Sequence, residues 1–139
     1  MEHEMTENEK KKEYLWGYKR AIRQMERHAL RIRELQLNQI CPAVIADGMP
    51  HASGGSDLSD FAAAMDEERR KYLKARYLRV KLCREIMDKI ERLPNEDEKD
   101  VLAFRYIKLM KWEDICVEIN LSWRRVHYIH SDALEHFIL

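Results

Sequence analysis

The chain has 139 residues, of which 25 are basic and 25 acidic, so its formal net charge at pH 7 is zero. This length suits one domain, or one domain with an extended element. Because only four glycines and three prolines interrupt the chain, long helices are expected and strands are not. No stretch resembles a signal peptide, and no apolar run approaches the roughly 18–20 residues of a membrane span. We therefore expect a soluble, cytoplasmic, all-α protein that contacts no membrane.

The reactive side chains do not form the motif of an enzyme or of a metal centre. The three cysteines, Cys41, Cys83 and Cys116, are odd in number and match no zinc-ligand spacing. His127 and His130 lie three residues apart, but no cysteine or carboxylate stands where it would complete a zinc site. A phosphate-binding loop, a nucleophile motif and paired catalytic carboxylates are all missing from the sequence. We expect no enzymatic activity, no cofactor and no metal.

The first forty residues predict a charged start followed by a long helix. Residues 1–13 are charged, and a flexible N-terminus is expected there, with a short exposed turn as the alternative. A helix over about residues 7–39 is indicated by apolar residues at a 3-4-3-4-3 spacing, namely Leu15, Tyr18, Ile22, Met25, Ala29 and Ile32. Since one helix cannot bury this stripe by itself, a partner helix is expected.

A change of composition marks a connection at residues 41–57. Residues 40–57 hold two of the three prolines and three of the four glycines, and they show no helical period. A connection of about 17 residues is longer than most links between helices. We interpret it as a flexible loop, with a partner-binding loop as the alternative.

A second long helix is predicted after this loop, ending near Leu93 because Pro94 cannot continue it. Its candidate N-terminal caps are Ser56, Asp57, Ser59 and Asp60. Its apolar stripe is broader than pairing with one helix requires, so it should also pack on the C-terminal segment or on another copy of the chain. We favour self-association, and expect residues 14–93 to form a long antiparallel, coiled-coil-like helical hairpin that makes a homo-oligomer.

Basic residues are dense over residues 69–84 of this second helix. Because Glu67, Glu68, Glu85 and Asp88 can pair with them at helical spacing, a solvated helix face is the simpler interpretation. The alternative is that part of this run lies against a DNA backbone and adds affinity that does not depend on sequence.

Residues 94–139 are punctuated like three short helices with two tight connections. Asn95 can cap the first helix, with Glu98 completing a capping box. The second helix should begin near Trp112, and Ser122 is placed to cap the third after a short turn. The third helix, residues 123–138, should point one set of residues inward, namely Val126, Ile129, Ala133, Leu134 and Phe137. Its outward set is Arg124, Arg125, His127, Tyr128 and Ser131. This is the plan of a helix-turn-helix.

The same segment resembles region 4 of bacterial sigma factors. The shared pattern is VL-x-x-RYI at residues 101–107, WEDI at 112–115, S-x-x-x-V-x-x-I at 122–129 and AL at 133–134. In that family the module is a helix-turn-helix that reads promoter DNA in the major groove. The whole chain resembles small Gram-positive phage regulators with a sigma-like tail, related in plan to the ArpU and RinA late-transcription regulators. The resemblance implies a phage or prophage transcription regulator that acts in a bacterial host cell.

The expected DNA contacts centre on the start of the third helix. Arginine is the commonest partner of guanine, so Arg124 is the first candidate for a base contact, followed by His127 and Tyr128. The resemblance also places Trp123 on the DNA side, with a packing role as its alternative, although the acidic residue common in that family at position 124 is absent. Arg125, Ser122 and Lys111 suit phosphates better. The full set of candidate DNA-binding residues is Lys111, Ser122, Trp123, Arg124, Arg125, His127, Tyr128 and Ser131.

The charge of this segment bears on how it would bind. From residue 94 to the end, nine acidic residues stand against six basic ones, a net charge of minus three with neutral histidines. One copy should therefore bind DNA weakly, and two copies on adjacent half-sites would compensate. We expect a sequence-specific regulator of double-stranded DNA that works as an oligomer. The alternative is a protein-interaction adaptor whose sigma-like tail contacts RNA polymerase or another protein.

Overall fold

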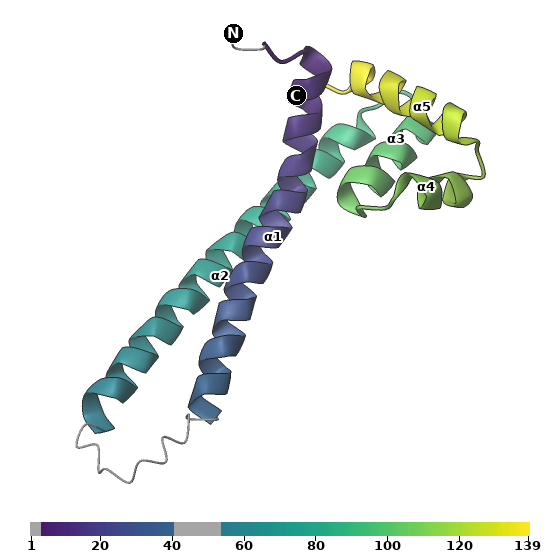
Figure 1. Cartoon of the computed structure of the whole chain (residues 1–139). Helices are drawn as coiled ribbons and strands as arrows, with labels where there is room; N and C mark the ends of the chain where they lie inside the picture. Colours follow the sequence, from purple (N-terminus) through teal and green to yellow (C-terminus); the bar gives the residue numbers. More distant parts are fainter. Residues whose placement is uncertain (1–3, 41–53) are drawn as a thin grey trace. The chain divides into compact units, whose positions relative to one another are not determined.

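The computed structural model describes residues 4–40 and 54–139, and every regular element in those ranges is helical. The elements are α1 (Glu7–Ile40), α2 (Gly54–Glu91), α3 (Glu96–Leu102), the π-helical turn η1 (Ala103–Ile107), α4 (Trp112–Ile119) and α5 (Trp123–His136) (Figure 1). The expected all-α class is confirmed for the described residues. None of these helices combines the length and the apolar character that a membrane span requires.

The described chain divides into two compact units, to which both long helices contribute. Unit 1 comprises the residues up to Ala21 together with Arg79–Leu139, and unit 2 comprises Ile22–Leu78. Unit 1 therefore crosses the boundary that the sequence suggested between residues 93 and 94. The start of α1 and the end of α2 belong to unit 1 together with the C-terminal helices.

The beginning of α1 differs from the flexible N-terminus expected over residues 1–13. Residues 7–13 are the first turns of the helix, because Thr6 and Glu9 form a capping box. The Glu9 N–H donates to Thr6 Oγ1 at 3.2 Å, and the Thr6 N–H donates to Glu9 Oε2 at 2.7 Å. Thr6 and Glu9 have the S/T-x-x-E spacing of a capping box in the sequence.

The predicted loop at residues 41–57 is shorter at its C-terminal end than expected, since α2 already begins at Gly54. Residues 41–53, with Cys41 among them, lie outside the described residues. At the other end α2 stops at Glu91, three residues before Pro94, as the sequence predicted.

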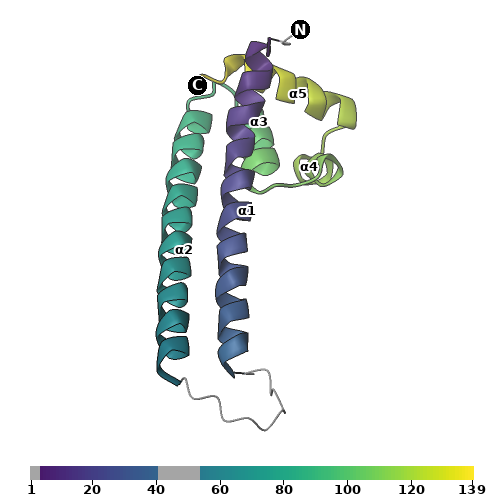
Figure 2. The ribbon, with the colours of Figure 1, turned by 60° about the vertical axis from the view of Figure 1, so that its left-hand side comes forward.

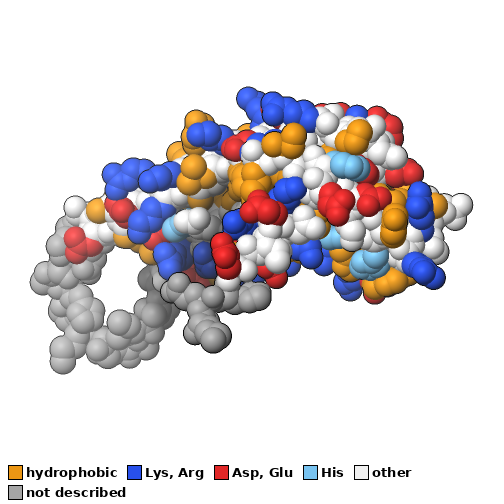
Figure 3. All heavy atoms as spheres, turned by 90° about the horizontal axis from the view of Figure 1, so that it is seen from above, with side chains coloured by type: hydrophobic (Ala, Val, Ile, Leu, Met, Phe, Trp, Pro, Cys, Tyr) orange, Lys and Arg blue, Asp and Glu red, His pale blue; other side chains and the backbone are white. Residues whose placement is uncertain are grey.

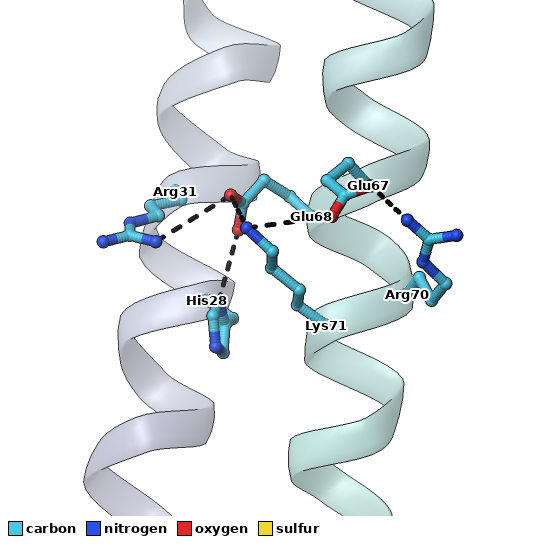
Figure 4. A network of polar contacts seen from close by, with 6 residues as sticks. All are labelled: His28, Arg31, Glu67, Glu68, Arg70 and Lys71. Atoms are coloured by element: carbon cyan, nitrogen blue, oxygen red, sulfur yellow. Dashed lines mark hydrogen bonds and ion pairs between the residues drawn. The ribbon is translucent and has the colours of Figure 1, made fainter.

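In unit 2, residues 22–40 of α1 and 54–78 of α2 run side by side in opposite directions (Figure 2). Met65 and Ala75 of α2 are buried, and the predicted α1 stripe is half-buried at Ile22, Met25, Ala29 and Ile32. An acidic group lies within this packing. Glu68, largely shielded from solvent, lies 3.2 Å from His28 Nδ1 and 3.9 Å from Arg31 Nη1, both on α1, so polar contacts link the two helices (Figure 4).

In unit 1, the start of α1 packs on the C-terminal helices. Leu15 is fully buried, and the Trp16 ring meets the Tyr106 ring edge-on with centroids 4.8 Å apart. Lys11 Nζ donates to the carbonyl of Leu134 at 2.7 Å, in the last turn of α5, where a cation satisfies unpaired carbonyls and the helix dipole. These contacts explain why residues far apart in the chain form one unit.

The end of α5 is joined to the start of α3 by an acidic side chain. Asn95 caps α3 as expected, since its side chain accepts the Asp97 N–H at 2.8 Å. The capping-box role predicted for Glu98 is not what the structure shows. Glu98 is buried, and its two carboxylate oxygens lie 2.9 and 3.0 Å from His136 Nδ1. A partner from α5 therefore takes the place of the local backbone N–H.

A polar contact lies in the core of unit 1 between Tyr106 of η1 and His130 of α5. The Tyr106 hydroxyl and His130 Nε2 are 2.8 Å apart, and both residues are buried. Burial raises the pKa of Tyr106 to about 12 and lowers the pKa of His130 to about 4. The positive charges of Lys12 and Arg105, and His127, lower the pKa of His130 further. A neutral imidazole at this position can accept the Tyr106 O–H, so the pair is satisfied without charge.

This contact predicts a pH-dependent loss of stability. The unfolded chain protonates His130 near pH 6.5, whereas the folded chain resists protonation down to about pH 4. Between these values the unfolded state binds more protons, so the free energy of unfolding should fall as the pH falls, by about 1 kcal/mol per pH unit from this residue. Urea unfolding of the wild type and of His130→Gln at pH 7, 6 and 5 checks it. The variant should show the shallower pH dependence, and equal slopes would contradict the prediction.

Candidate nucleic-acid interface

A tight connection of three residues joins α4 to α5. Asn120 ends α4 in the left-handed conformation, with φ 57° and ψ 46°, and its N–H bonds to the carbonyls of Cys116 and Val117. Asparagine tolerates this conformation better than most residues. Ser122 then caps α5, since its Oγ accepts the Arg125 N–H at 3.2 Å. The predicted turn and cap are confirmed, and together they determine where α5 starts.

The inner side of this segment is an apolar core. Val101, Ile115, Val126 and Ile129 form a buried cluster, and Trp112 packs against it. All five α5 residues predicted to face inward are buried: Val126, Ile129, Ala133, Leu134 and Phe137. The opposite side of α5 is thereby left to solvent.

The outer face of α5 carries most of the predicted DNA-binding residues. Arg124, Tyr128 and Ser131 are exposed and follow the i, i+4, i+7 spacing of one helix face. Ser122, Arg124, Arg125 and Tyr128 line an open hollow of about 300 Å³. We call Ser122, Arg124, Arg125, Tyr128 and Ser131 the α5 face. Its donors, two guanidinium groups and three hydroxyls, suit an anionic or hydrogen-bonding ligand.

His127 was predicted to lie on the α5 face, but the structure places it elsewhere. Its ring is half-buried between Trp112 and Trp123, with centroids at 4.4 and 4.5 Å, and its Nε2 is buried without a hydrogen-bond partner among the described residues. The i, i+4 spacing brings His127 onto Trp123, and stacking withdraws it from solvent. Trp123 itself stays 51% exposed, so it packs on His127 while much of its side chain remains in solvent.

Arg105 supports the start of α4, a role that the sequence reading missed. Its guanidinium carbon lies 4.6 Å from the centre of the Trp112 ring and 5.2 Å from that of Trp16, and Nη1 donates to the Met110 carbonyl at 2.9 Å. Arg105 belongs to the π-helical turn η1, which continues α3 directly, and Leu109, whose φ is 56°, lies between it and Met110 in the chain. Leu109 is neither glycine nor asparagine, so no residue type signalled the turn.

Lys111 and the acidic residues after it surround the start of α4. Lys111 occupies the N-cap position, is exposed, and makes no capping hydrogen bond with its side chain. Glu113 and Asp114 follow in the first turn, where carboxylates stabilise the helix dipole. Acidic, basic and hydrophobic side chains are interspersed on the face of the molecule seen in Figure 3.

A metal site or a cysteine-based site finds little support in the described part of the chain. No three His, Cys, Asp or Glu side chains gather there as a potential metal site. Cys83 and Cys116 are free and half-buried, and Cys83 Sγ lies 3.8 Å from Met87 Sδ. The α5 face is therefore the candidate functional site.

The capping role of Ser122 predicts a measurable effect on stability. Ser122→Ala removes the acceptor of the Arg125 N–H and should lower the free energy of unfolding by about 1 kcal/mol. Ser131→Ala, at an exposed position inside the same helix, is the control and should change stability by less than about 0.5 kcal/mol. Urea denaturation followed by circular dichroism compares the two. If both substitutions lowered the free energy of unfolding equally, the capping role of Ser122 would be contradicted.

Comparisons of this chain with protein-family models, with curated proteins and with solved structures found no match.

Proposed function

We propose that this protein is a sequence-specific DNA-binding transcription regulator of phage or prophage type, acting in the cytoplasm of a bacterial host. The observation that carries the proposal is the α5 face, presented by a capped helix directly after a three-residue turn from α4. A short helix, a tight turn and a second helix with a basic, hydrogen-bonding outer side fit the helix-turn-helix plan, in which the second helix enters the major groove. The resemblance of residues 101–134 to sigma region 4 supports the same reading.

The place of each residue on or beside the α5 face suggests which part of the DNA it would contact. Arg124 lies in the first turn of α5 on the same side as Tyr128, and its guanidinium can form paired hydrogen bonds with a guanine edge. Arg125 and Ser122 lie at the helix terminus, where phosphate contacts are favourable. Lys111, exposed before α4, would add a further phosphate contact. His127 would act indirectly, by holding the half-exposed Trp123 ring beside the groove.

Oligomerisation belongs to the proposal because one copy offers few cations to DNA. With nine acidic and six basic residues after position 93, a second α5 face on an adjacent half-site would raise the affinity. The outer side of α1 in unit 2 supports pairing with another copy. Leu30 and Leu37 are exposed one heptad apart. The helical neighbours of Leu30 carry both signs, namely Glu26, Arg27, Arg33 and Glu34. The same surface on a second copy of the chain can therefore pack against the Leu30 surface without net charge repulsion.

A second candidate function is a protein-interaction adaptor that contacts RNA polymerase or another protein. The observation that favours it is Val117 on α4, whose side chain is 81% exposed among exposed Glu113, Asp114 and Glu118. An apolar residue within an acidic patch suits a protein surface with basic groups, whereas DNA would be repelled there. We rank this function second because the basic groups of the α5 face then have no assigned ligand.

Adjacent arginines provide a matched test of the DNA-reading role. Arg124→Ala should weaken binding to the preferred duplex by about 1–3 kcal/mol and relax the preference at one base position, because a base contact is lost. Arg125→Ala removes the same charge one residue later. It should weaken binding to all sequences alike and reduce the slope of log K against log salt by about 1, because a phosphate contact is lost.

Selection of bound sequences from random duplex DNA, followed by salt titrations of each variant, measures both effects. Identical sequence preferences in wild type and Arg124→Ala would contradict the reading role of Arg124. An affinity that does not change between about 50 and 200 mM salt would contradict DNA binding through this face as a whole.

The oligomer is tested by changing the exposed leucines of α1. The double substitution Leu30→Ser with Leu37→Ser should shift the protein toward the monomer and weaken DNA binding at least tenfold, because only one α5 face then reaches the duplex. Leu58→Ser, which changes an exposed leucine of α2, is the control. Sedimentation equilibrium at about 10 µM, a concentration typical for weak dimers, gives the masses. A monomeric wild type would remove the oligomer from the proposal.

A further inference from the structure

One segment of α2 in unit 2 combines a dense positive charge with exposed apolar side chains. Residues 69–78 contain five basic residues and no acidic one. Within the same segment Leu73 is 60% exposed and Tyr77 is 66% exposed, although a helix that packs on only one side normally presents polar residues outward. Neither the packing of unit 2 nor the α5 face uses these two side chains.

Leu73 and Tyr77 lie together on the side of α2 that faces away from its packing. Each is two residues from the buried Ala75, which places both about 160° from it around the helix. They are four residues apart, so their side chains are neighbours on the helix surface. The remaining neighbours of Leu73 at three and four residues are Arg69, Arg70 and Arg76, and Lys74 lies three residues before Tyr77. Leu73 is thus flanked by three arginines, and Tyr77 has a lysine beside it.

Most of these cations are not neutralised within the described part of the chain. Arg70 pairs with Glu67, and Lys71 lies 3.7 Å from Glu68 (Figure 4). Arg69, Lys74 and Arg76 form no ion pair with any described residue. The side chains around Leu73 and Tyr77 therefore keep an uncompensated positive charge.

The charge decides between possible occupants of this surface. A second copy of the same surface would set arginine and lysine against arginine and lysine, unlike the mixed-sign surface around Leu30 on α1. A nucleic-acid backbone would satisfy the cations, but it offers phosphates and sugars where Leu73 and Tyr77 need an apolar partner. An amphipathic helix with an apolar stripe and acidic flanks satisfies both requirements.

We propose that the α2 docking surface, formed by Arg69, Arg70, Leu73, Lys74, Arg76 and Tyr77, binds an acidic amphipathic helix of another protein. The apolar stripe of that helix packs on Leu73 and Tyr77, and its flanking carboxylates pair with Arg69, Lys74 and Arg76. The surface lies in unit 2, whereas the α5 face lies in unit 1. The inference therefore stands whether or not α5 reads DNA, and it goes beyond the proposed function by assigning a separate protein-binding site.

The experiment uses the full chain and a designed probe. The probe is a fluorescent 21-residue peptide of three heptads with Leu at positions a and d and Glu at positions e and g. The control peptide has the same sequence with Lys in place of each Glu. Fluorescence anisotropy should give a Kd on the order of 10 µM for the Glu peptide, a value that rises with salt, and no binding of the Lys peptide.

Variants of the chain test whether the peptide sits on this surface. Leu73→Ser and Tyr77→Ser should each weaken Glu-peptide binding by roughly tenfold or more, as for central apolar anchors. The double substitution Lys74→Glu with Arg76→Glu should do the same through charge. Leu58→Ser and Arg33→Glu change exposed residues outside the surface and should leave binding unchanged. Arg124→Ala should also leave it unchanged, which separates this site from the DNA-reading role. Because all these residues are exposed, helix content should be retained, and circular dichroism verifies it.

Several results would overturn the proposal. No binding of the Glu peptide at about 100 µM, tenfold above the expected Kd, or equal binding of the Lys peptide, would exclude an acidic helix as the occupant. If Leu73→Ser instead converted a dimer to a monomer in sedimentation, the occupant would be a second copy. If the Lys74→Glu and Arg76→Glu variant lost affinity for a random 30-base-pair duplex but kept the peptide, the occupant would be DNA.

Discussion

The contact between Tyr106 and His130 is the one on which the rest of unit 1 depends. It joins η1 to α5, and both rings continue into further aromatic contacts. Successive ring centroids along Trp16, Tyr106, His130, Trp112, His127 and Trp123 lie 4.8, 5.8, 4.8, 4.4 and 4.5 Å apart. Contacts of this kind contribute about 0.5–1.5 kcal/mol each beyond burial. This aromatic row runs from α1 to the first residue of α5, so the packing of the core also sets the surface that α5 presents.

The aromatic row also bears on the charge of residues 94–139, which carry more acidic than basic side chains. Arg105, held between the rings of Trp16 and Trp112, and Lys11, bonded to the end of α5, are cations used for structure. The acidic residues include Glu98, which is buried against His136. Net charge therefore understates what the α5 face offers, because part of the charge of either sign is already committed inside unit 1. Arg124 and Arg125 remain exposed, and they are the groups on which the proposed DNA binding rests.

The long helices carry two outer surfaces of different character. Around Leu30 on α1 the charges are mixed, which permits association between copies, whereas around Leu73 on α2 they are all positive, which disfavours it. The sequence reading treated the broad apolar stripe of the second helix as one reason for self-association. Burial separates that stripe into an inner part, with Met65, Ile86 and Ile90 buried, and an outer part at Leu73 and Tyr77 that stays exposed. The two parts call for different partners.

The sequence by itself determined the helical class, the start of α4 at Trp112, the cap at Ser122 and the inward residues of α5, because each depends on neighbours within about four positions. Only the tertiary structure decided the roles of Glu98, Arg105 and His127. The partner of Glu98 stands 38 residues away at His136, and Tyr106 and His130 are 24 residues apart. No local pattern encodes such pairs. The withdrawal of His127 from the α5 face also needed the ring of Trp112 from another helix, so its place became visible only once α4 was packed against α5.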